Sequence, residues 1–244
     1  MMMLKWLKAP QKRAVLEAVA DSDTPASSYL ITGGADIEAE GVKLEAGARV
    51  ALVGEDAYRK HYFCDWLLGF VDVAGRAVRM RVGDCELETG RERAQAAAVL
   101  GRSPLLYGET IQEALLYRTH EVRKHDLFHL VERFYGPSLR SRTSPLNPLL
   151  DAQSKPLPTQ ILTAREHLEI AQINVLLQKT PVVILDLSSE LMAEAISEGF
   201  RPAQPLFESG KTILAILPPG KDLAWAEQVT GTRFSAEIDF TAKT

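Results

Sequence analysis

The sequence predicts an α/β fold in which a parallel sheet is built around one strand, a loop that begins with glycine, and the helix that follows it. An apolar run over residues 49–53 ends at Gly54, and Lys60 follows six residues later. Continuous apolar runs over residues 181–186 and 211–217 are typical of parallel strands that are buried on both faces. Because strands and helices alternate along the chain, we expect right-handed crossovers within one sheet.

The stretch around Gly54 has the layout of a P-loop, G-x-x-x-x-G-K-[ST], whose backbone N–H groups hold phosphate oxygens. Gly54 and Lys60 match the first glycine and the lysine of this motif. Arg59 replaces the second glycine, and His61 replaces the hydroxyl residue that holds magnesium. Glycine serves at such positions because it adopts backbone angles that are closed to other residues, so these replacements oppose phosphate binding.

Two carboxylates, Glu55 and Asp56, lie in the middle of this loop. Like charges at about 4 Å oppose each other by roughly 4 kcal/mol at an effective dielectric near 20, so both side chains would repel a bound polyanion. We therefore predict a P-loop NTPase core that has lost its nucleotide chemistry.

The composition is that of an ordinary globular protein, with 244 residues, of which 46% are hydrophobic and 25% charged. A net charge of -4 gives no reason to expect nucleic acid as a partner. Cys64 and Cys85 lack metal-binding spacing, which favours a reducing, cytoplasmic setting. No run approaches the roughly 20 apolar residues of a membrane span, and the N-terminus lacks the apolar region of a signal peptide. We therefore expect any membrane association to be peripheral.

Residues 1–28 are predicted to form a short basic helix and a linker, and residues 29–244 are predicted to form one domain. Short apolar segments within residues 29–47 favour an antiparallel ribbon that leads into the first core strand. Helical spacing of apolar residues follows over residues 60–70. The alternation over residues 76–88 predicts two short strands joined by a turn.

The middle of the chain carries weaker patterns. Residues 94–100 suit either a strand or a helix, and we expect a strand. A helix is predicted to start near Thr110, an amphipathic helix to cover residues 121–135, and a proline-rich irregular segment to cover residues 136–160. These elements suggest a helical insert over about residues 115–165.

In the last third of the chain, predicted strands and helices alternate more clearly. Residues 166–178 and 191–200 are predicted to be helical, and the segment DLAWAEQV leads to a final strand that is predicted at residues 237–240. These helices separate the apolar strands, as in an α/β sheet.

In this order, the segments resemble the ATP-binding domain of an ABC transporter, in the form found in exporters, from about residue 29 to residue 240. LEAGARVALVG resembles the strand that enters the P-loop, and SPLLYGETIQEALLY resembles the segment after the Q-loop. LTAREHLEIAQINVLLQKTPVVILD resembles the signature helix and the Walker B strand, and KTILAIL resembles the strand before the switch histidine. The resemblance implies an ABC ATPase-like core with an antiparallel β subdomain and a helical insert.

Most functional positions of that family carry other residues here. The Q-loop glutamine falls on Arg102, and the LSGGQ signature falls on residues 162–166. The Walker B aspartate is present as Asp186, but the glutamate after it is Leu187 and the switch histidine is Pro218. Phosphoryl transfer depends on positioned amides, a lysine, a metal and an oriented water, so the resemblance implies a degenerate ATPase without catalytic residues.

Three positions remain as vestigial cofactor-binding candidates, Gly54, Lys60 and Asp186. No resident cofactor and no metal site are expected. Lys60 also has a second interpretation, as a lysine at a helix start that is solvated or pairs with Glu55 or Asp56.

The first functional hypothesis is a pseudo-ATPase, a non-catalytic ABC-ATPase-like subunit that acts as a structural or regulatory partner of a membrane transport or secretion complex. Its partner would be a related ABC ATPase subunit or a membrane-embedded transporter component, and a homodimer is an alternative. The second hypothesis is an ATP-binding subunit of an ABC exporter that binds ATP and magnesium and hydrolyses ATP weakly or only with its partner. A small-molecule kinase is disfavoured because the matched spacing would then be coincidence.

Three arginines would lie near the site in such a fold, at Arg59, Arg102 and Arg165. We predict that they pair with internal carboxylates and so replace the charges of a ligand. The candidate carboxylates are Glu55, Asp56, Asp186 and Glu166.

Two histidines elsewhere, His125 and His129, have the i, i+4 spacing that can suit zinc on a helix. No third ligand is evident nearby in the sequence, so an exposed helical face is the favoured interpretation.

Overall fold

The computed structural model describes residues 34–39, 42–73, 77–102, 106–119, 127, 130–131, 143–144, 147–151, 153, 155–202 and 204–241. The predicted N-terminal helix and linker at residues 1–28 lie outside the described residues, as do His125 and His129. Of the helix predicted over residues 121–135, only residues 127, 130 and 131 are described, and all three are helical and buried.

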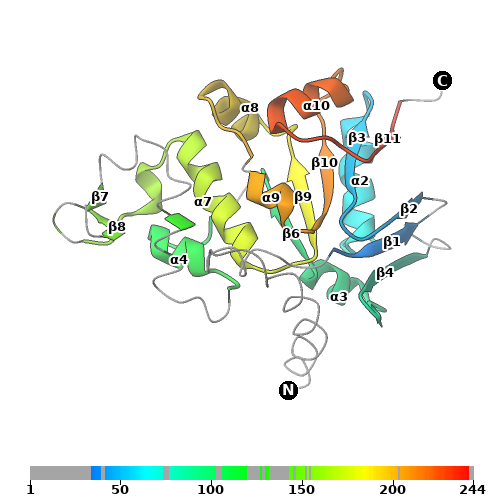
Figure 1. Cartoon of the computed structure of the whole chain (residues 1–244), viewed down its shortest axis with the longest axis horizontal. Helices are drawn as coiled ribbons and strands as arrows, with labels where there is room; N and C mark the ends of the chain where they lie inside the picture. Colours follow the sequence, from blue (N-terminus) through cyan, green and yellow to red (C-terminus); the bar gives the residue numbers. More distant parts are fainter. Residues whose placement is uncertain are drawn as a thin grey trace, which may run out of the picture.

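A five-stranded parallel sheet forms the centre of the molecule (Figure 1). Its spatial order is β11 (Ala236–Asp239), β3 (Arg49–Val53), β10 (Thr212–Ile216), β9 (Val182–Asp186) and β6 (Ala97–Leu100). The predicted parallel strands at residues 181–186 and 211–217 are therefore confirmed. Because β10 lies between β3 and β9, the ends of these three strands meet at one edge of the sheet.

Hydrophobic residues on the two faces of this sheet enter two separate cores. On β9, Val183 and Leu185 belong to one core, whereas Val182 and Ile184 belong to the other. This alternation explains why the strand reads as a continuous apolar run, since both faces are covered.

Helices follow the strands as the alternating pattern predicts. They are α2 (Ala57–Leu67), α7 (Ala164–Leu177), α8 (Glu190–Ser197), α9 (Gln204–Glu208) and α10 (Leu223–Thr230). Residues of α7, α8 and α9 enter the same core as the Val183 face, and residues of α2 enter the opposite core. Of these helices, α9 has no counterpart among the sequence predictions.

A second, antiparallel sheet packs into the α2 side. Its order is β2 (Val42–Leu44), β1 (Asp36–Ala39), β4 (Val78–Val82) and β5 (Cys85–Glu86). The ribbon predicted before the first core strand is thus confirmed for β1 and β2. The predicted turn between β4 and β5 is also confirmed, with Gly83 at a φ of 58°.

The short helix α3 (Gly90–Gln95) corrects the strand predicted over residues 94–100, which begins only at Ala97. A capping box fixes the start of α3, because the Thr89 hydroxyl accepts from the Glu92 N–H and the Glu92 carboxylate accepts from the Thr89 N–H. The helix predicted near Thr110 is present as α4 (Ile111–Leu116), capped in the same way.

The segment predicted to be irregular, residues 136–160, contains ordered structure where it is described. Strands β7 (Thr143–Ser144) and β8 (Asn147–Asp151) form a two-stranded ribbon, and the 3-10 helix η2 (Thr159–Ile161) follows. Pro148 lies within β8. A proline is tolerated at strand edges and irregularities, and the pairing of β8 with β7 shifts register between Thr143 and Ser144.

Helix α2 starts three residues earlier than the predicted helix at residues 60–70. The cause is Asp56, whose side chain accepts a hydrogen bond from the Arg59 N–H at 2.9 Å and so caps the helix. The helix ends at Leu67, and Gly69 follows with a φ of 75°.

Candidate functional site

The candidate site lies at the edge where β3, β9 and β10 end. Gly54 follows β3, Asp186 is the last residue of β9, and Leu217 follows β10. Ile216 lies opposite Leu52 on β3 and opposite Asp186 on β9, so the three strand ends are level. The carboxyl ends of parallel strands are where α/β proteins bind ligands.

The turn between β3 and α2 is short. Only three residues, 54–56, separate the strand from the helix, whereas a P-loop has four residues between its two glycines alone. The Asp56 carboxylate occupies the N-terminal end of α2, where a phosphate would be held, and its second oxygen lies 3.0 Å from Arg59 Nε. The N-terminal end of α2 is therefore capped by a carboxylate of the chain itself.

Gly54 is required for a reason other than phosphate binding. Its φ is +102°, and a Cβ atom there would lie 2.6 Å from the backbone of Phe240 and Thr241. The packing of the segment after β11 against this turn therefore demands glycine on steric grounds alone.

Lys60 is fully buried, with 0% of its surface exposed. Its Nζ donates to the carbonyl oxygens of Gly54 at 2.6 Å and Leu217 at 2.7 Å. Burial lowers the pKa of Lys60, while the charges of Glu55, Asp56 and Asp186 oppose this shift. The amine thus joins the ends of β3 and β10. The second sequence interpretation, a solvated lysine or a direct ion pair with Glu55 or Asp56, does not describe this arrangement.

Asp186 is also buried and fully engaged. Its Oδ1 accepts from the Ser188 N–H at 3.0 Å and from the Ser188 hydroxyl at 2.6 Å, and its Oδ2 accepts from Arg102 Nε at 3.4 Å. The predicted pairing of Arg102 with Asp186 is therefore confirmed.

Arg102 presents each of its three nitrogens to a different acceptor. Nη1 donates to Asp65 Oδ1 at 2.8 Å, and Nη2 donates to His61 Nδ1 at 2.6 Å, in addition to the Nε contact with Asp186. Burial opposes the charge on Arg102, but the hydrogen bond to Asp65 and the nearby carboxylates outweigh it and raise the arginine pKa. This side chain joins the end of β6 to α2 and β9.

These contacts fix the proton on His61. A guanidinium has no acceptor, so His61 Nδ1 must accept from Arg102, and the ring proton resides on Nε2. Nε2 lies 3.2 Å from Ser188 Oγ and donates to it, and the Ser188 hydroxyl donates to Asp186. A closed ring of hydrogen bonds results, and we assign the tautomer from this network.

The ring has two chemical consequences. The 3.6 Å separation of His61 Nδ1 and Asp186 Oδ2 is not an ion pair, because Nδ1 carries no proton. Ser188, His61 and Asp186 also do not form a nucleophilic triad, because the imidazole lone pair faces Arg102 instead of the Ser188 hydroxyl.

Gly101 places Arg102 beside Asp186. With a φ of +103°, its Cα passes so close to β9 that an added Cβ would lie 2.3 Å from the Asp186 carbonyl oxygen. Only glycine allows these two segments of the chain to approach so closely. The side chain of the next residue, Arg102, then reaches the Asp186 carboxylate.

The third predicted arginine, Arg165, pairs elsewhere. Its Nε lies 2.8 Å from Glu169 Oε1, and its Nη1 donates to the Glu198 carbonyl. Glu166, one of the four candidate carboxylates, accepts from the Thr163 N–H in the capping box of α7. Arg165 therefore pairs with an internal carboxylate as predicted, but with Glu169, which was not among the candidates.

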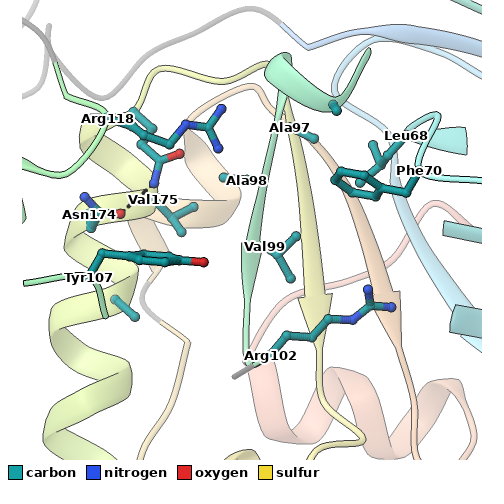
Figure 2. A pocket seen from close by; sticks show the side chains of 13 residues that line it. Leu68, Phe70, Ala97, Ala98, Val99, Arg102, Tyr107, Arg118, Asn174 and Val175 are labelled. Atoms are coloured by element: carbon teal, nitrogen blue, oxygen red, sulfur yellow. Dashed lines mark hydrogen bonds between the residues drawn. The ribbon is translucent and has the colours of Figure 1, made fainter. Parts of the chain in front are cut away.

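A groove of about 270 Å³ runs along β6 beside the ring. Figure 2 shows Phe70 and Arg102 on one side of β6, and Tyr107, Arg118 and Asn174 on the α7 side. Phe70 is 61% exposed and Tyr107 is 48% exposed. These exposed rings give the groove an aromatic rim.

Sequence reasoning identified Arg102 and His61 but missed Ser188, which closes the ring, and Asp65, which accepts from Arg102 beside it. Asp65 is one helical turn after His61 and therefore faces the same side of α2. Ser188 is two residues after Asp186 and reaches its carboxylate through a local turn. The spacing of Asp65 from His61 and of Ser188 from Asp186 can be read from the sequence, and both would have been noticed if Asp186 had been taken as the centre of a charged cluster.

ATP and magnesium, which the ABC resemblance implies, do not fit the residues present. The position beside Asp186 that a cation needs is filled by the Arg102 guanidinium, and the Lys60 amine is held by two carbonyl groups. Among the described residues, no group of three or more His, Cys, Asp or Glu side chains is arranged to hold a metal ion.

Within the described residues, the fold is that of a mixed α/β protein with a five-stranded parallel sheet, a four-stranded antiparallel sheet and a two-stranded antiparallel ribbon. No protein-family model and no curated protein matches the sequence. A bacterial Atm1-family ABC exporter, solved with ATP bound, matches the structure with a TM-score of 0.53 and 14% sequence identity. The match covers 77% of this chain and 34% of that chain, so the present chain spans about a third of the exporter's length. At this identity the likeness concerns the fold, which 643 matching chains share and which by itself does not assign a function.

Within the described part of the chain, every helix is too short or too polar to cross a bilayer.

Proposed function

We propose that this chain is a non-catalytic ABC-ATPase-like subunit with a degenerate P-loop core that acts as a structural or regulatory partner of a membrane transport or secretion complex. The observation that carries the proposal is that both surviving motif side chains are satisfied internally. The Lys60 amine is bound by two carbonyl groups, and the Asp186 carboxylate is bound by Arg102 and Ser188. Gly54, Lys60 and Asp186 are accordingly vestigial cofactor positions. The domain would extend over residues 29–244, preceded by the N-terminal helix and linker.

The likeness to an exporter supports the class of partner. We propose a related ABC ATPase subunit or a membrane-embedded transporter component, with a homodimer as the alternative, and no role in nucleic-acid binding. The aromatic rim of the groove, at Phe70 and Tyr107, is the surface that we assign to the partner. The protein would then be cytoplasmic, at the cytoplasmic face of a membrane.

A second function remains in competition, an ATP-binding exporter subunit with weak or partner-dependent hydrolysis. It is favoured by the strand ends, which place Lys60 close enough to Asp186 for the two charges to interact. Under this alternative, ATP and magnesium would displace the internal contacts of both side chains.

Titration with MgATP separates the two functions. A ligand at a hundredfold excess over its dissociation constant stabilises the folded state by about 2.7 kcal/mol, which thermal unfolding detects. We expect no shift of the wild-type protein at millimolar MgATP, and calorimetry should show no binding heat. A saturable shift that requires Lys60 would support the exporter ATPase instead.

A further inference from the structure

The groove along β6 carries positive charge without a compensating carboxylate. Arg102 and Arg118 line it, whereas none of the described aspartate and glutamate side chains does. Arg102 is held by three acceptors on one side of β6. Arg118 is exposed, and its side chain forms no ion pair or hydrogen bond within the described part of the chain. The Arg118 guanidinium is therefore available to an anion.

The backbone at Arg118 has an unusual conformation. Its φ is 56°, a left-handed value that residues other than glycine rarely adopt and that is found more often at functional sites. On α7, the Asn174 amide donates to the carbonyl oxygens of Leu115 at 3.0 Å and Tyr117 at 2.8 Å, which ties the end of α4 to α7. Figure 2 shows the Arg118 side chain extending from this end towards β6.

Gln178 adds an unpaired acceptor to the wall of the groove. Because the Asn174 nitrogen donates to two carbonyl groups, Asn174 Oδ1 is the atom that accepts from Gln178 Nε2, at 2.5 Å. The orientation of the Gln178 amide is thereby assigned. Its Oε1 is buried and has no hydrogen-bond donor among the described residues. A buried acceptor without a donor is unfavourable, so a ligand N–H group would be stabilised here.

The rest of the lining is mostly apolar or aromatic. β6 is the outermost strand of the parallel sheet on this side, and its residues 97–99 line the groove together with Val175 of α7. The Tyr107 ring stacks on the Tyr117 ring, with 4.3 Å between the centroids. The volume of about 270 Å³ lies near the lower end of the range for small-molecule pockets.

We propose that this groove binds a small organic carboxylate that carries an apolar body and an N–H group, as an N-acylated apolar amino acid does. The Arg118 guanidinium binds the carboxylate through two parallel hydrogen bonds. The apolar body lies between Val175 and the Tyr107 ring, and the N–H group donates to Gln178 Oε1. An apolar lining with a few placed polar groups is the usual composition of a small-molecule site.

The ligand site goes beyond the proposed function and adds a form of regulation to it. Because Phe70 and Tyr107 also form the aromatic rim assigned to the partner, a bound ligand changes that surface; this consequence rests on the proposed function. The two can fail separately. Ligand binding is measured on the purified chain without nucleotide or partner, whereas the MgATP titration concerns Lys60 and Asp186.

The test is the binding of N-acetyl-L-phenylalanine to the wild-type chain, measured by calorimetry and by ligand-observed NMR. We expect a dissociation constant of about 1 mM or below. The matched neutral probe, N-acetyl-L-phenylalaninamide, should bind at least about 10-fold more weakly, because it has no carboxylate for Arg118. A third probe, 3-phenylpropionate, lacks the N–H group and should bind about 5-fold more weakly.

Two variants locate the site. Arg118→Gln removes the guanidinium and should weaken the binding of N-acetyl-L-phenylalanine at least about 10-fold. The variant should fold normally, because the Arg118 side chain is exposed and unpaired within the described residues. The matched control is Lys179→Gln, since Lys179 is also exposed and has a φ of 53° but does not line the groove. It should leave the affinity unchanged.

Four results would overturn the proposal. They are equal binding of the charged and neutral probes, undiminished binding by folded Arg118→Gln, equal weakening by Lys179→Gln, and no binding to wild type at about 10 mM probe. Equal affinity of 3-phenylpropionate and N-acetyl-L-phenylalanine would overturn the role of Gln178 as the acceptor of a ligand N–H group.

Discussion

The two ends of the parallel sheet each bury a lysine, but they treat its charge differently. At the carboxyl end, Lys60 donates to two carbonyls, and three carboxylates favour its charge. At the amino end, Lys211 precedes β10, is 1% exposed, and donates to the Thr180 carbonyl at 2.5 Å. Burial lowers the pKa of Lys211 to about 7, with no carboxylate among the described residues contributing to its shift. Within the described part of the chain, the carboxyl end is therefore a charge-compensated centre, and the amino end holds an uncompensated amine.

The largest expected effect comes from removing the compensating charge. Asp186→Ala should lower the free energy of unfolding by about 3–5 kcal/mol, because it leaves the buried side of Arg102 and the Ser188 hydroxyl without their acceptor. Denaturant unfolding measures this loss. The control is Asp36→Ala, which breaks an exposed pair with Arg81 in the antiparallel sheet and should cost less than about 1 kcal/mol. Equal losses would show that Asp186 is an ordinary surface carboxylate.

The next largest effect is the pH dependence of stability that Lys211 contributes at the amino end of the sheet. The folded pKa of Lys211 is about 7, below its ordinary value of 10.5, so the unfolded chain binds more protons between these values. The free energy of unfolding should therefore rise with pH from about 7 to 10, by at most about 4 kcal/mol, and the full penalty should apply below pH 7. Unfolding of wild type and Lys211→Met across this range isolates the contribution of Lys211. Parallel curves for the two proteins would contradict the prediction.

The stabilities of the Lys60→Met and Lys211→Met variants at neutral pH compare the two lysines directly. Lys60→Met should destabilise the protein by about 2–3 kcal/mol, since two buried carbonyls lose their donor. Lys211→Met should stabilise it by about 1–2 kcal/mol, because removing a buried, uncompensated amine outweighs the loss of one hydrogen bond. Chemical denaturation of both variants at pH 7 provides the measurement. Shifts of the same sign would remove the distinction between the two ends.

The smallest effects are expected at the surface of the α2 turn. Asp56→Ala removes the helix cap and should cost about 1 kcal/mol. Arg59→Ala breaks only an ion pair whose arginine is 60% exposed, and should cost less than about 0.5 kcal/mol. Thermal unfolding of the two variants resolves this order. A larger loss for Arg59 would indicate that the pair, and not the cap, holds the turn.

Apolar periodicity was sufficient to predict the strands that carry the site. The runs that became β3, β9 and β10 are continuous because both faces of the sheet are covered, and the segment that became α7 has the length and spacing of a helix. The short elements were not predictable in the same way. Helix α3 depends on a local capping box, and β7 and β8 depend on pairing with each other.

The site was only partly predictable. The resemblance to a known family pointed to Lys60, Arg102 and Asp186, because each falls on a functional position of that family. The ring itself unites segments that are distant in sequence, with His61 on α2 and Ser188 after β9. Its closure depends on which nitrogen of an imidazole faces a guanidinium, a property that no spacing encodes.

The tight packing at Gly54 affects how the first glycine of the P-loop-like motif is interpreted. The neighbouring C-terminal segment, at Phe240 and Thr241, leaves no room for any side chain there. Correct packing therefore requires this glycine whether or not the chain binds a nucleotide. The presence of the glycine is accordingly weak evidence for ATP binding, and the contacts of the Lys60 amine are more informative.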